Sequence, residues 1–286
     1  MAGTALIDDF LAAKRAAGAS EHTLAGYLTA WQAFAGWHKE TTGQPLDPAA
    51  VSSLDAAEFR RYLQGAIKPS SVNTRLRQVK AVFAWAAQAG ALERDPLREV
   101  RQVPEGEAPV RTLDRRAMAA LLREAQKGGG VRDVALYTLL AQTGLRIAEA
   151  LALTWDDLII RERSGFVTVR KGKGGKRRTV PLTLTARTAL LAWREAAGAA
   201  SGDPVFPIGA RAVQKALTRY ARRAGIEGKV TPHMFRHTFC KALVDAGESL
   251  DRVALLAGHS SLSTTARYTK PTEEDLEQAV SKLEWV

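Results

Sequence analysis

A stretch near the C-terminal end of the chain concentrates side chains that can handle a phosphate group. His233 and Arg236 lie three residues apart, His259 follows a glycine, and Tyr268 lies nine residues further on. Three of the five histidines of the chain fall within residues 231–268. Arginine and histidine donate hydrogen bonds to phosphate oxygens, and tyrosine is a nucleophile once its proton is removed. The stretch is therefore compatible with a solvated helical face or with a site that transfers a phosphoryl group.

Two earlier segments offer complementary groups. Arg146 is predicted at the start of a helix after a tight turn, where free backbone N–H groups favour an anion. Glu149 lies three residues on and can orient Arg146. The same spacing is also typical of an ordinary surface ion pair, which contributes little to stability. Lys173 lies in the glycine-rich turn KGKGGKRR. There it is either a solvated basic residue or a mobile group that reaches a leaving oxygen or the minor groove.

A metal site is the competing interpretation of the histidines. His233 and His237 have the i, i+4 spacing of metal ligands, but the zinc-protease pattern needs a glutamate where this chain has Met234. No acidic residue close in sequence completes a ligand set, so we expect no metal. Cys240 is the single cysteine, which excludes an internal disulfide and a cysteine zinc site. We expect it to be a buried structural thiol.

Taken together, the candidate residues form a set that can act on a phosphodiester. Two arginines, a lysine and two histidines can neutralise the charge that develops on the phosphate without a metal. A tyrosine, whose unperturbed pKa is about 10, can capture the phosphorus covalently. Covalent capture stores the energy of the phosphodiester, so the strand can be rejoined without ATP. The set predicts cleavage and resealing of DNA through a phosphotyrosine, with no cofactor.

The charge of the chain favours an acidic partner. The 286 residues carry a net charge of +11, and the isoelectric point is about 10.0. Residues 1–104 hold 12 Lys and Arg against 10 Asp and Glu, a net of +2, whereas the remainder holds 29 against 20, a net of +9. The excess accompanies the candidate site and favours nucleic acid. No apolar run is long enough to span a membrane, and the N-terminus does not resemble a signal peptide, so we expect a cytoplasmic protein without a membrane partner.

The pattern of apolar residues predicts a mainly α fold with one small β-sheet or hairpin region. Residues 1–98 form a four-helix unit, 99–111 a linker rich in proline and charge, and 112–286 a second, α+β unit. Ser20 is the expected N-cap of the second helix, and Ser52 with Asp55 that of the third. Short β-prone runs lie at 158–160, 166–169 and 178–180. Helices are expected at about 4–17, 20–42, 52–64, 70–90, 114–126, 131–143, 147–153, 183–197, 209–224, 232–246, 250–257, 261–268 and 273–284.

The fourth helix of the first unit is a candidate DNA-binding element. Asn73, Arg75, Arg77 and Lys80 lie on its early turns. They are compatible with groove and phosphate contacts or with a solvated polar face. Lys176, in the basic turn beside Lys173, is a further candidate for DNA contact.

Several motifs in order resemble the tyrosine recombinase (phage integrase) family: TGLRIAEAL, KGKGGKRRTVPL, HMFRHTF and LAGHSSLSTTARYT. SEHTLAGYLTAWQAFAGW and SSVNTRLRQVKAVFAWAAQAG resemble the core-binding domain of that family. The resemblance implies a helical core-binding domain and a catalytic domain that close on duplex DNA as a C-shaped clamp. It also implies a tetramer, of one recombinase or of two related ones, that recombines two specific DNA sites through a Holliday junction.

The resemblance assigns roles to matched positions. Tyr268 attacks the scissile phosphate, giving a 3′-phosphotyrosyl link and a free 5′-hydroxyl. Arg146 and Arg236 hold the non-bridging oxygens, and His259 donates a hydrogen bond to the phosphate. Lys173 is the general acid to the leaving 5′-oxygen.

The remaining roles are supporting ones. His233 assists proton transfer as the base near the tyrosine. Glu149 buttresses the arginines and histidines, and His237 has a structural role beside Arg236.

Weaker signals bear on the subfamily. The chain is similar in length to XerC/XerD-type proteins and to simple mobile-element integrases. Its ending, YTKPTEEDLEQAVSKLEW, departs from the Xer pattern, and this departure favours a transposon, phage or plasmid element. Leu276, Val280 and Leu283 form an apolar stripe in the tail. It is compatible with docking into a neighbouring protomer or with packing on its own domain.

Three alternative functions remain open at this level. A type IB topoisomerase uses the same chemistry as a monomer and would relax supercoils without forming junctions. A non-catalytic DNA-binding regulator would bind its site without forming a covalent complex. A metal-dependent hydrolase built on His233, His237 and His259 would be inhibited by EDTA and would tolerate loss of Tyr268.

Overall fold

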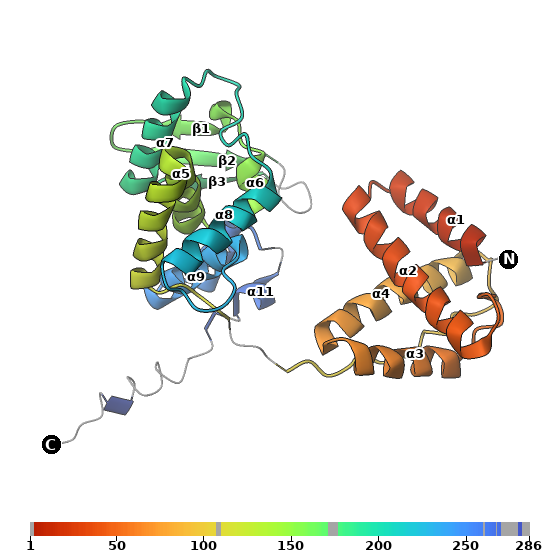
Figure 1. Ribbon diagram of the computed structural model, residues 1–286. Helices are drawn as coiled ribbons and strands as arrows, with labels where there is room; N and C mark the ends of the chain where they lie inside the picture. Colours follow the sequence, from red (N-terminus) through yellow and green to blue (C-terminus); the bar gives the residue numbers. More distant parts are fainter. Residues whose placement is uncertain are drawn as a thin grey trace. The chain divides into compact units, whose positions relative to one another are not determined.

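The computed structural model describes residues 3–106, 110–170, 177–259, 261–266, 268–269 and 280–281. The chain divides into two compact units, Met1–Ala108 and Pro109–Val286 (Figure 1). Helices dominate both units, and the described strands form one three-stranded sheet. This confirms the predicted mainly α fold with a small β region.

The first unit contains the four predicted helices. They are α1 (Gly3–Ala16), α2 (Glu21–Thr42), α3 (Ser53–Ala66) and α4 (Pro69–Gln88). The Ser20 side chain accepts a hydrogen bond from the Thr23 N–H, which caps α2. Ser52 and Asp55 form the predicted capping box of α3. Side-chain caps satisfy backbone N–H groups that have no partner within the helix, so these short polar signals fix where the helices begin.

Aromatic rings join the four helices into one core. Phe34 of α2 lies edge-on to Phe59 of α3, with ring centroids 4.9 Å apart, and to Phe83 of α4, with centroids 5.7 Å apart. Phe10 of α1 packs against Trp85 of α4 in the same manner. Such edge-to-face contacts add to the free energy gained by burying the rings, so the unit has its own hydrophobic core.

The segment that leaves the first unit is held against α4. The Asn73 side chain donates to the Val103 carbonyl and accepts from the Val103 N–H, each at 2.8 Å. The Lys80 ammonium donates to the carbonyls of Arg98 and Val100. Asn73 is only 2% exposed, so the prediction that it contacts DNA is wrong: its amide fastens the start of the expected linker to α4.

In the second unit, α5 (Arg115–Thr143) is the central helix (Figure 1). It packs against α7 (Leu184–Ala197), α8 (Ala210–Arg223) and α9 (Pro232–Asp245). Its path bends at Gly130, whose φ of 67° and ψ of −157° interrupt the helical conformation. The predicted break between two helices is therefore present, although the two halves run on as one element. The second half is almost wholly buried, as its apolar sequence predicted.

The sheet has the order β1-β2-β3, and both pairs of strands are antiparallel (Figure 1). The strands are β1 (Leu158–Ile160), β2 (Gly165–Val169) and β3 (Arg178–Pro181). Val167 of β2 pairs with Leu158 on one side and with Val180 on the other. Val167 and Val180 belong to the buried core of the unit, so this register turns one face of the sheet inward.

The remaining described elements complete the second unit. They are α6 (Ile147–Leu151), the 3-10 turn η1 (Trp155–Asp157), α7 (Leu184–Ala197), α8 (Ala210–Arg223), α9 (Pro232–Asp245), α10 (Leu250–Ala257) and α11 (Leu262–Ala266). The α-helices among them agree with the predicted ones, although α6 ends two residues before the predicted end at 153, and η1 was not predicted. The predicted tail helix at 273–284, with Leu276 and Leu283, falls almost wholly outside the described residues. Among the described residues, no helix is both long and apolar enough to cross a membrane.

Candidate active site

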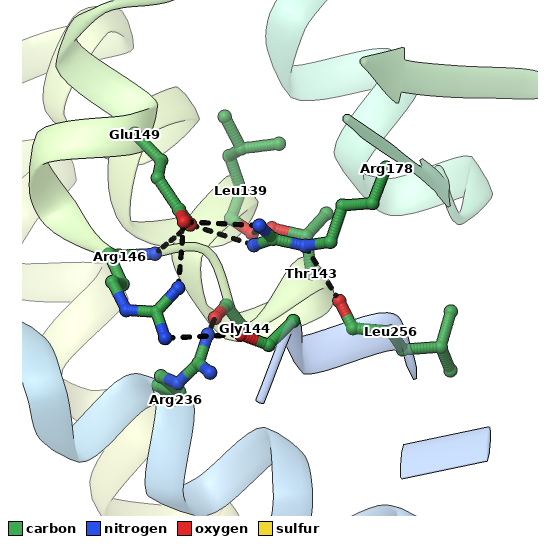
Figure 2. Close-up of polar contacts among 9 residues, drawn as sticks. Leu139, Thr143, Gly144, Arg146, Glu149, Arg178, Arg236 and Leu256 are labelled. Atoms are coloured by element: carbon green, nitrogen blue, oxygen red, sulfur yellow. Dashed lines mark hydrogen bonds and ion pairs between the residues drawn. The ribbon is translucent and has the colours of Figure 1, made fainter. Parts of the chain in front are cut away.

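Glu149 is the centre of a buried cluster of charged side chains in the second unit (Figure 2). Its carboxylate accepts from the Arg146 N–H at 2.9 Å and from Arg146 Nη1 at 2.8 Å. Arg178 donates to both carboxylate oxygens, Nη1 to Oε1 at 3.0 Å and Nη2 to Oε2 at 2.7 Å. Burial alone would raise the pKa of Glu149, but the hydrogen bonds from Arg178 and Arg146 outweigh it and lower the pKa to about 2. Glu149 is thus ionised and holds both arginines.

Arg178 was read from the sequence only as part of a β-prone run. In the structure it is the first residue of β3, and its side chain is 8% exposed. Besides the pair with Glu149, its Nε donates to the Leu256 carbonyl at 3.1 Å, near the end of α10 (Figure 2). Arg178 therefore ties the sheet to α6 and α10. The sequence feature that could have identified Arg178 as a site residue is its place inside the motif KGKGGKRRTVPL.

Arg236 is the most deeply buried of the arginines, at 1% exposure. Pro232 opens α9, as predicted, and Arg236 projects from its second turn so that Nη1 donates to the Gly144 carbonyl at 2.9 Å (Figure 2). Its other terminal nitrogen, Nη2, is buried without a hydrogen-bond partner among the described residues. Burial and the nearby Arg146 lower the pKa of Arg236 to about 10, so it stays charged at neutral pH. A buried charged donor without a partner is costly, and an anion bound there would satisfy it.

Two glycines allow these segments to approach one another. Gly144 ends α5 with a φ of 61°, and Gly258 ends α10 with a φ of 68°. The Gly258 carbonyl accepts from Arg146 Nη2 at 3.2 Å. A β-carbon at residue 258 would lie 2.8 Å from Arg178 Nη1. Glycine is thus required there both for backbone conformation and for space.

We call Arg146, Glu149, Arg178 and Arg236 the guanidinium cluster. It contains three guanidinium groups, which remain protonated in proteins, and one ionised carboxylate. Arg146 and Arg178 bond that carboxylate directly, and Arg236 interacts with it electrostatically. The cluster therefore carries a net charge of +2, and one of its donors, Arg236 Nη2, has no hydrogen-bond partner among the residues that the structure describes. Its electrostatics favour an anion such as a phosphodiester.

His259 follows α10 directly, and it lies beside the cluster. Its Nδ1 is 2.8 Å from the hydroxyl oxygen of Thr265, which is fully buried. Burial, followed by the charges of Arg236 and Arg146, lowers the pKa of His259 to about 4. The ring is therefore neutral at pH 7. When Thr265 donates to Nδ1, the ring proton is on Nε2, where it is a donor for an anion.

Tyr268 is 3% exposed and packs with Cys240, Val253 and Ala257. Its ring stacks on His259, with centroids 6.3 Å apart and an interplanar angle of 12°. Its hydroxyl oxygen is 2.6 Å from His237 Nδ1. The predicted buried state of Cys240 is confirmed.

His237, which the sequence placed in a structural role, thus contacts the hydroxyl of the candidate nucleophile. His233 is exposed, and its ring lies edge-on to His237 with centroids 4.4 Å apart. The expected neighbourhood of histidine and tyrosine exists, and His237 Nδ1 lies within hydrogen-bonding distance of the hydroxyl.

The other candidate residues do not add to this cluster. Lys173 and Lys176 lie outside the described residues. Arg75 and Arg77 belong to the first unit, where Arg77 is exposed and its Nε donates to the Asn73 carbonyl. Across the part of the chain that the structure describes, no three His, Cys, Asp or Glu side chains group as a metal site requires.

The phage integrase family matches this chain over residues 111–275, which include the guanidinium cluster, His259 and Tyr268. The chain belongs to this family of tyrosine recombinases. It is 34% identical over 269 residues to tyrosine recombinase XerC of Xanthomonas campestris pv. campestris (strain B100), covering 87% of this chain and 79% of the relative. XerC of Rhodospirillum centenum (strain ATCC 51521 / SW) is 36% identical over 279 residues, with 91% and 80% covered.

Solved structures of recombinases have the same fold as this tyrosine recombinase. XerH bound to a palindromic difH substrate, in a post-cleavage complex, aligns with a TM-score of 0.77 at 21% identity and covers 94% of this chain and 82% of its own. The Tn1549 transposon integrase in complex with transposon right end DNA aligns with a TM-score of 0.76 at 19% identity, covering 99% of both chains. The predicted family, fold and enzyme class are thereby confirmed.

Proposed function

We propose that this tyrosine recombinase cuts and rejoins duplex DNA at a specific site through a 3′-phosphotyrosyl intermediate. The observation that carries the proposal is the guanidinium cluster, with its net positive charge and its unpaired Arg236 Nη2, in the same unit as His259 and Tyr268. A scissile phosphate bound there would accept hydrogen bonds from Arg236, Arg146 and neutral His259. These donors would stabilise the charge that develops on the non-bridging oxygens during attack.

The reaction proceeds in two matched transfers. The Tyr268 hydroxyl gives its proton to a histidine base, and its oxygen bonds to phosphorus as the bond to the 5′-oxygen breaks. The leaving oxygen takes a proton from Lys173, the general acid that the family resemblance assigns. A 5′-hydroxyl then attacks the phosphotyrosine, which restores the phosphodiester and frees the tyrosine. One phosphodiester replaces another, so neither ATP nor a metal is required.

Strand exchange requires more than one active site. We propose that four protomers, of this chain alone or with a related recombinase, bring two DNA sites together and pass through a Holliday junction. The helical first unit would act as the core-binding domain and close on the duplex with the catalytic unit as a C-shaped clamp. Arg75, Arg77, Lys80 and Lys176 are proposed as DNA contacts. The reaction would take place in the cytoplasm.

The decisive experiment is covalent trapping on a nicked suicide duplex. The wild-type protein should form a DNA–protein complex that survives denaturation, with the 3′ end of the cut strand attached and EDTA without effect. Tyr268→Phe should bind the duplex with unchanged Kd and form no covalent complex. Site binding without trapping by the wild type would instead make the protein a regulator, and trapping that persists in Tyr268→Phe would move the nucleophile elsewhere.

The same substrates distinguish recombination from topoisomerase activity. A recombinase should convert paired sites to four-way junctions, whereas a type IB topoisomerase would relax supercoiled plasmid without joining two duplexes. Mapping the trapped phosphates on genomic DNA then separates an XerC-type role, which the curated relatives favour, from the mobile-element role favoured by the tail sequence.

A further inference from the structure

The contact between His237 and Tyr268 has no part in the roles described so far. His237 follows Arg236 on α9, so one helix carries both a phosphate donor and a side chain that reaches the nucleophile. The distance of 2.6 Å between His237 Nδ1 and the Tyr268 hydroxyl oxygen is that of a short, well-formed hydrogen bond. A general base must lie within this range of the proton that it removes.

The groups around the hydroxyl narrow the choice of proton acceptor. Cys240, one turn along α9, also lies within hydrogen-bonding reach of Tyr268, but burial raises the pKa of its thiol. The thiol is therefore protonated at neutral pH and has little capacity to take a second proton. Glu149 is fully engaged by Arg146 and Arg178. His237 is the contacting group whose side chain ordinarily exchanges protons near neutral pH.

Several charged and titratable groups face His237. His233, in the first turn of α9, lies edge-on to the His237 ring. On the segment that follows α11, the centroid of the Tyr268 ring lies 5.6 Å from that of the His237 ring. On α9 itself, Arg236 precedes it, Cys240 follows one turn on, and Lys241 lies four residues on, where it pairs with Asp245. His237 therefore lies between the His233 ring on its own helix and the ring of the candidate nucleophile.

We propose that His237, rather than His233, accepts the proton of Tyr268 during DNA cleavage, an inference that rests on the proposed function. Neutral His237 carries its own proton on Nε2 and accepts the hydroxyl hydrogen bond at Nδ1. As the tyrosine oxygen bonds to phosphorus, its proton passes to Nδ1 and the bond to the 5′-oxygen breaks. The leaving oxygen receives its proton from Lys173. In rejoining, the imidazolium returns the proton to the departing tyrosine oxygen.

His233 takes a secondary place in this scheme. Its ring touches His237 edge-on, so it fixes the orientation of the imidazole that meets the hydroxyl. On the sequence alone, proton transfer was assigned to His233 and a structural role to His237, and both residues lie in the motif HMFRHTF.

The test measures single-turnover formation of the covalent complex by the full-length protein on nicked suicide DNA, across about pH 5 to 9. His237→Asn keeps an oxygen acceptor near the place of Nδ1 but cannot take a proton. It should keep the wild-type Kd and Tm, slow cleavage by about 10²–10⁴-fold, and lose the acidic limb of the pH profile. His233→Asn, the matched variant, should keep that limb.

A second arm separates proton transfer from mere positioning. Replacing Tyr268 with 3,5-difluorotyrosine lowers the pKa of the phenol, so that it ionises without a base. This replacement should restore most of the rate lost in His237→Asn, which a structural defect would not permit.

Three results would overturn the inference: a His237→Asn enzyme with the wild-type rate and pH profile, no rescue by difluorotyrosine, or loss and rescue in His233→Asn instead. Each leaves the proposed function intact as long as the wild type is trapped on DNA and Tyr268→Phe is not. Absence of trapping by the wild type would reject both.

Discussion

Arg178 and Glu149, 29 residues apart in the chain, form a two-pronged ion pair with both side chains more than nine-tenths buried. Glu149 also holds Arg146, and Arg178 also reaches the carbonyl of Leu256 (Figure 2). The pair therefore connects β3, α6 and α10 around one carboxylate. Because Arg178 satisfies Glu149 from one side, Arg146 keeps a fixed orientation toward the proposed phosphate site.

We expect Arg178→Gln to impair both stability and cleavage. Removing one partner of a buried pair leaves a partly uncompensated charge, which lowers the free energy of unfolding by about 3 kcal/mol. The remaining ion pair between Arg146 and Glu149 offsets part of this loss. Cleavage on suicide DNA should fall more than DNA binding, because Arg146 loses its fixed position. Arg177→Gln is the matched control, since Arg177 is the exposed neighbour in the same basic run and its loss removes the same charge. Equal behaviour of the two variants in urea denaturation and trapping would contradict this role.

The ionisation of Glu149 should appear in the acid stability of the protein. Its pKa is lowered from 4.5 to about 2 in the folded state. A lowered folded pKa contributes stability that is fully present above about pH 4.5 and is lost as pH falls toward 2, a contribution of roughly 3 kcal/mol. Glu149→Gln should therefore show a shallower decline of unfolding free energy across this window. An identical decline in the two proteins, measured by urea denaturation at a series of pH values, would refute the assignment.

The local parts of the site could be predicted from the sequence, and the distant ones could not. Arg146 and Glu149 are three residues apart, so helical geometry alone placed them together. The pair between Arg178 and Glu149 depends on the sheet folding back against α6, which no local spacing encodes. Arg178 was therefore assigned only to a strand.

Asn73 and His237 show a second limit of sequence reasoning. A polar residue on an early helical turn looks exposed until another segment covers it, and here the backbone at Val103 does so. His237 looked structural because its partner, Tyr268, lies 31 residues further along the chain. In both cases the sequence identified the helix correctly, but long-range packing decided what its side chains contact.

The second terminal nitrogen of Arg236 should matter for cleavage more than for folding. Arg236→Lys keeps a positive charge but loses the fork that places Nη1 on the Gly144 carbonyl and Nη2 toward the anion site. We expect cleavage on suicide DNA to fall by about 10²–10³-fold, the range for loss of a preorganised donor. Site binding should weaken far less, because many other phosphate contacts contribute to it. A lysine variant with near-normal trapping would show that charge alone is sufficient.

Gly258→Ala should disturb the position of Arg178 in the guanidinium cluster, although residue 258 is not a member of the cluster. At a φ of 68°, alanine adds backbone strain of about 1–2 kcal/mol, and its β-carbon would lie 2.8 Å from Arg178 Nη1. The guanidinium cannot move aside freely, because Glu149 holds both of its terminal nitrogens. Gly198→Ala is the matched control: its φ is 59°, yet nothing lies within 4 Å of the added carbon. We expect both variants to lose stability in thermal unfolding, and Gly258→Ala alone to lose cleavage. Equal trapping by the two variants would show that the approach of residue 258 to Arg178 has no consequence for the site.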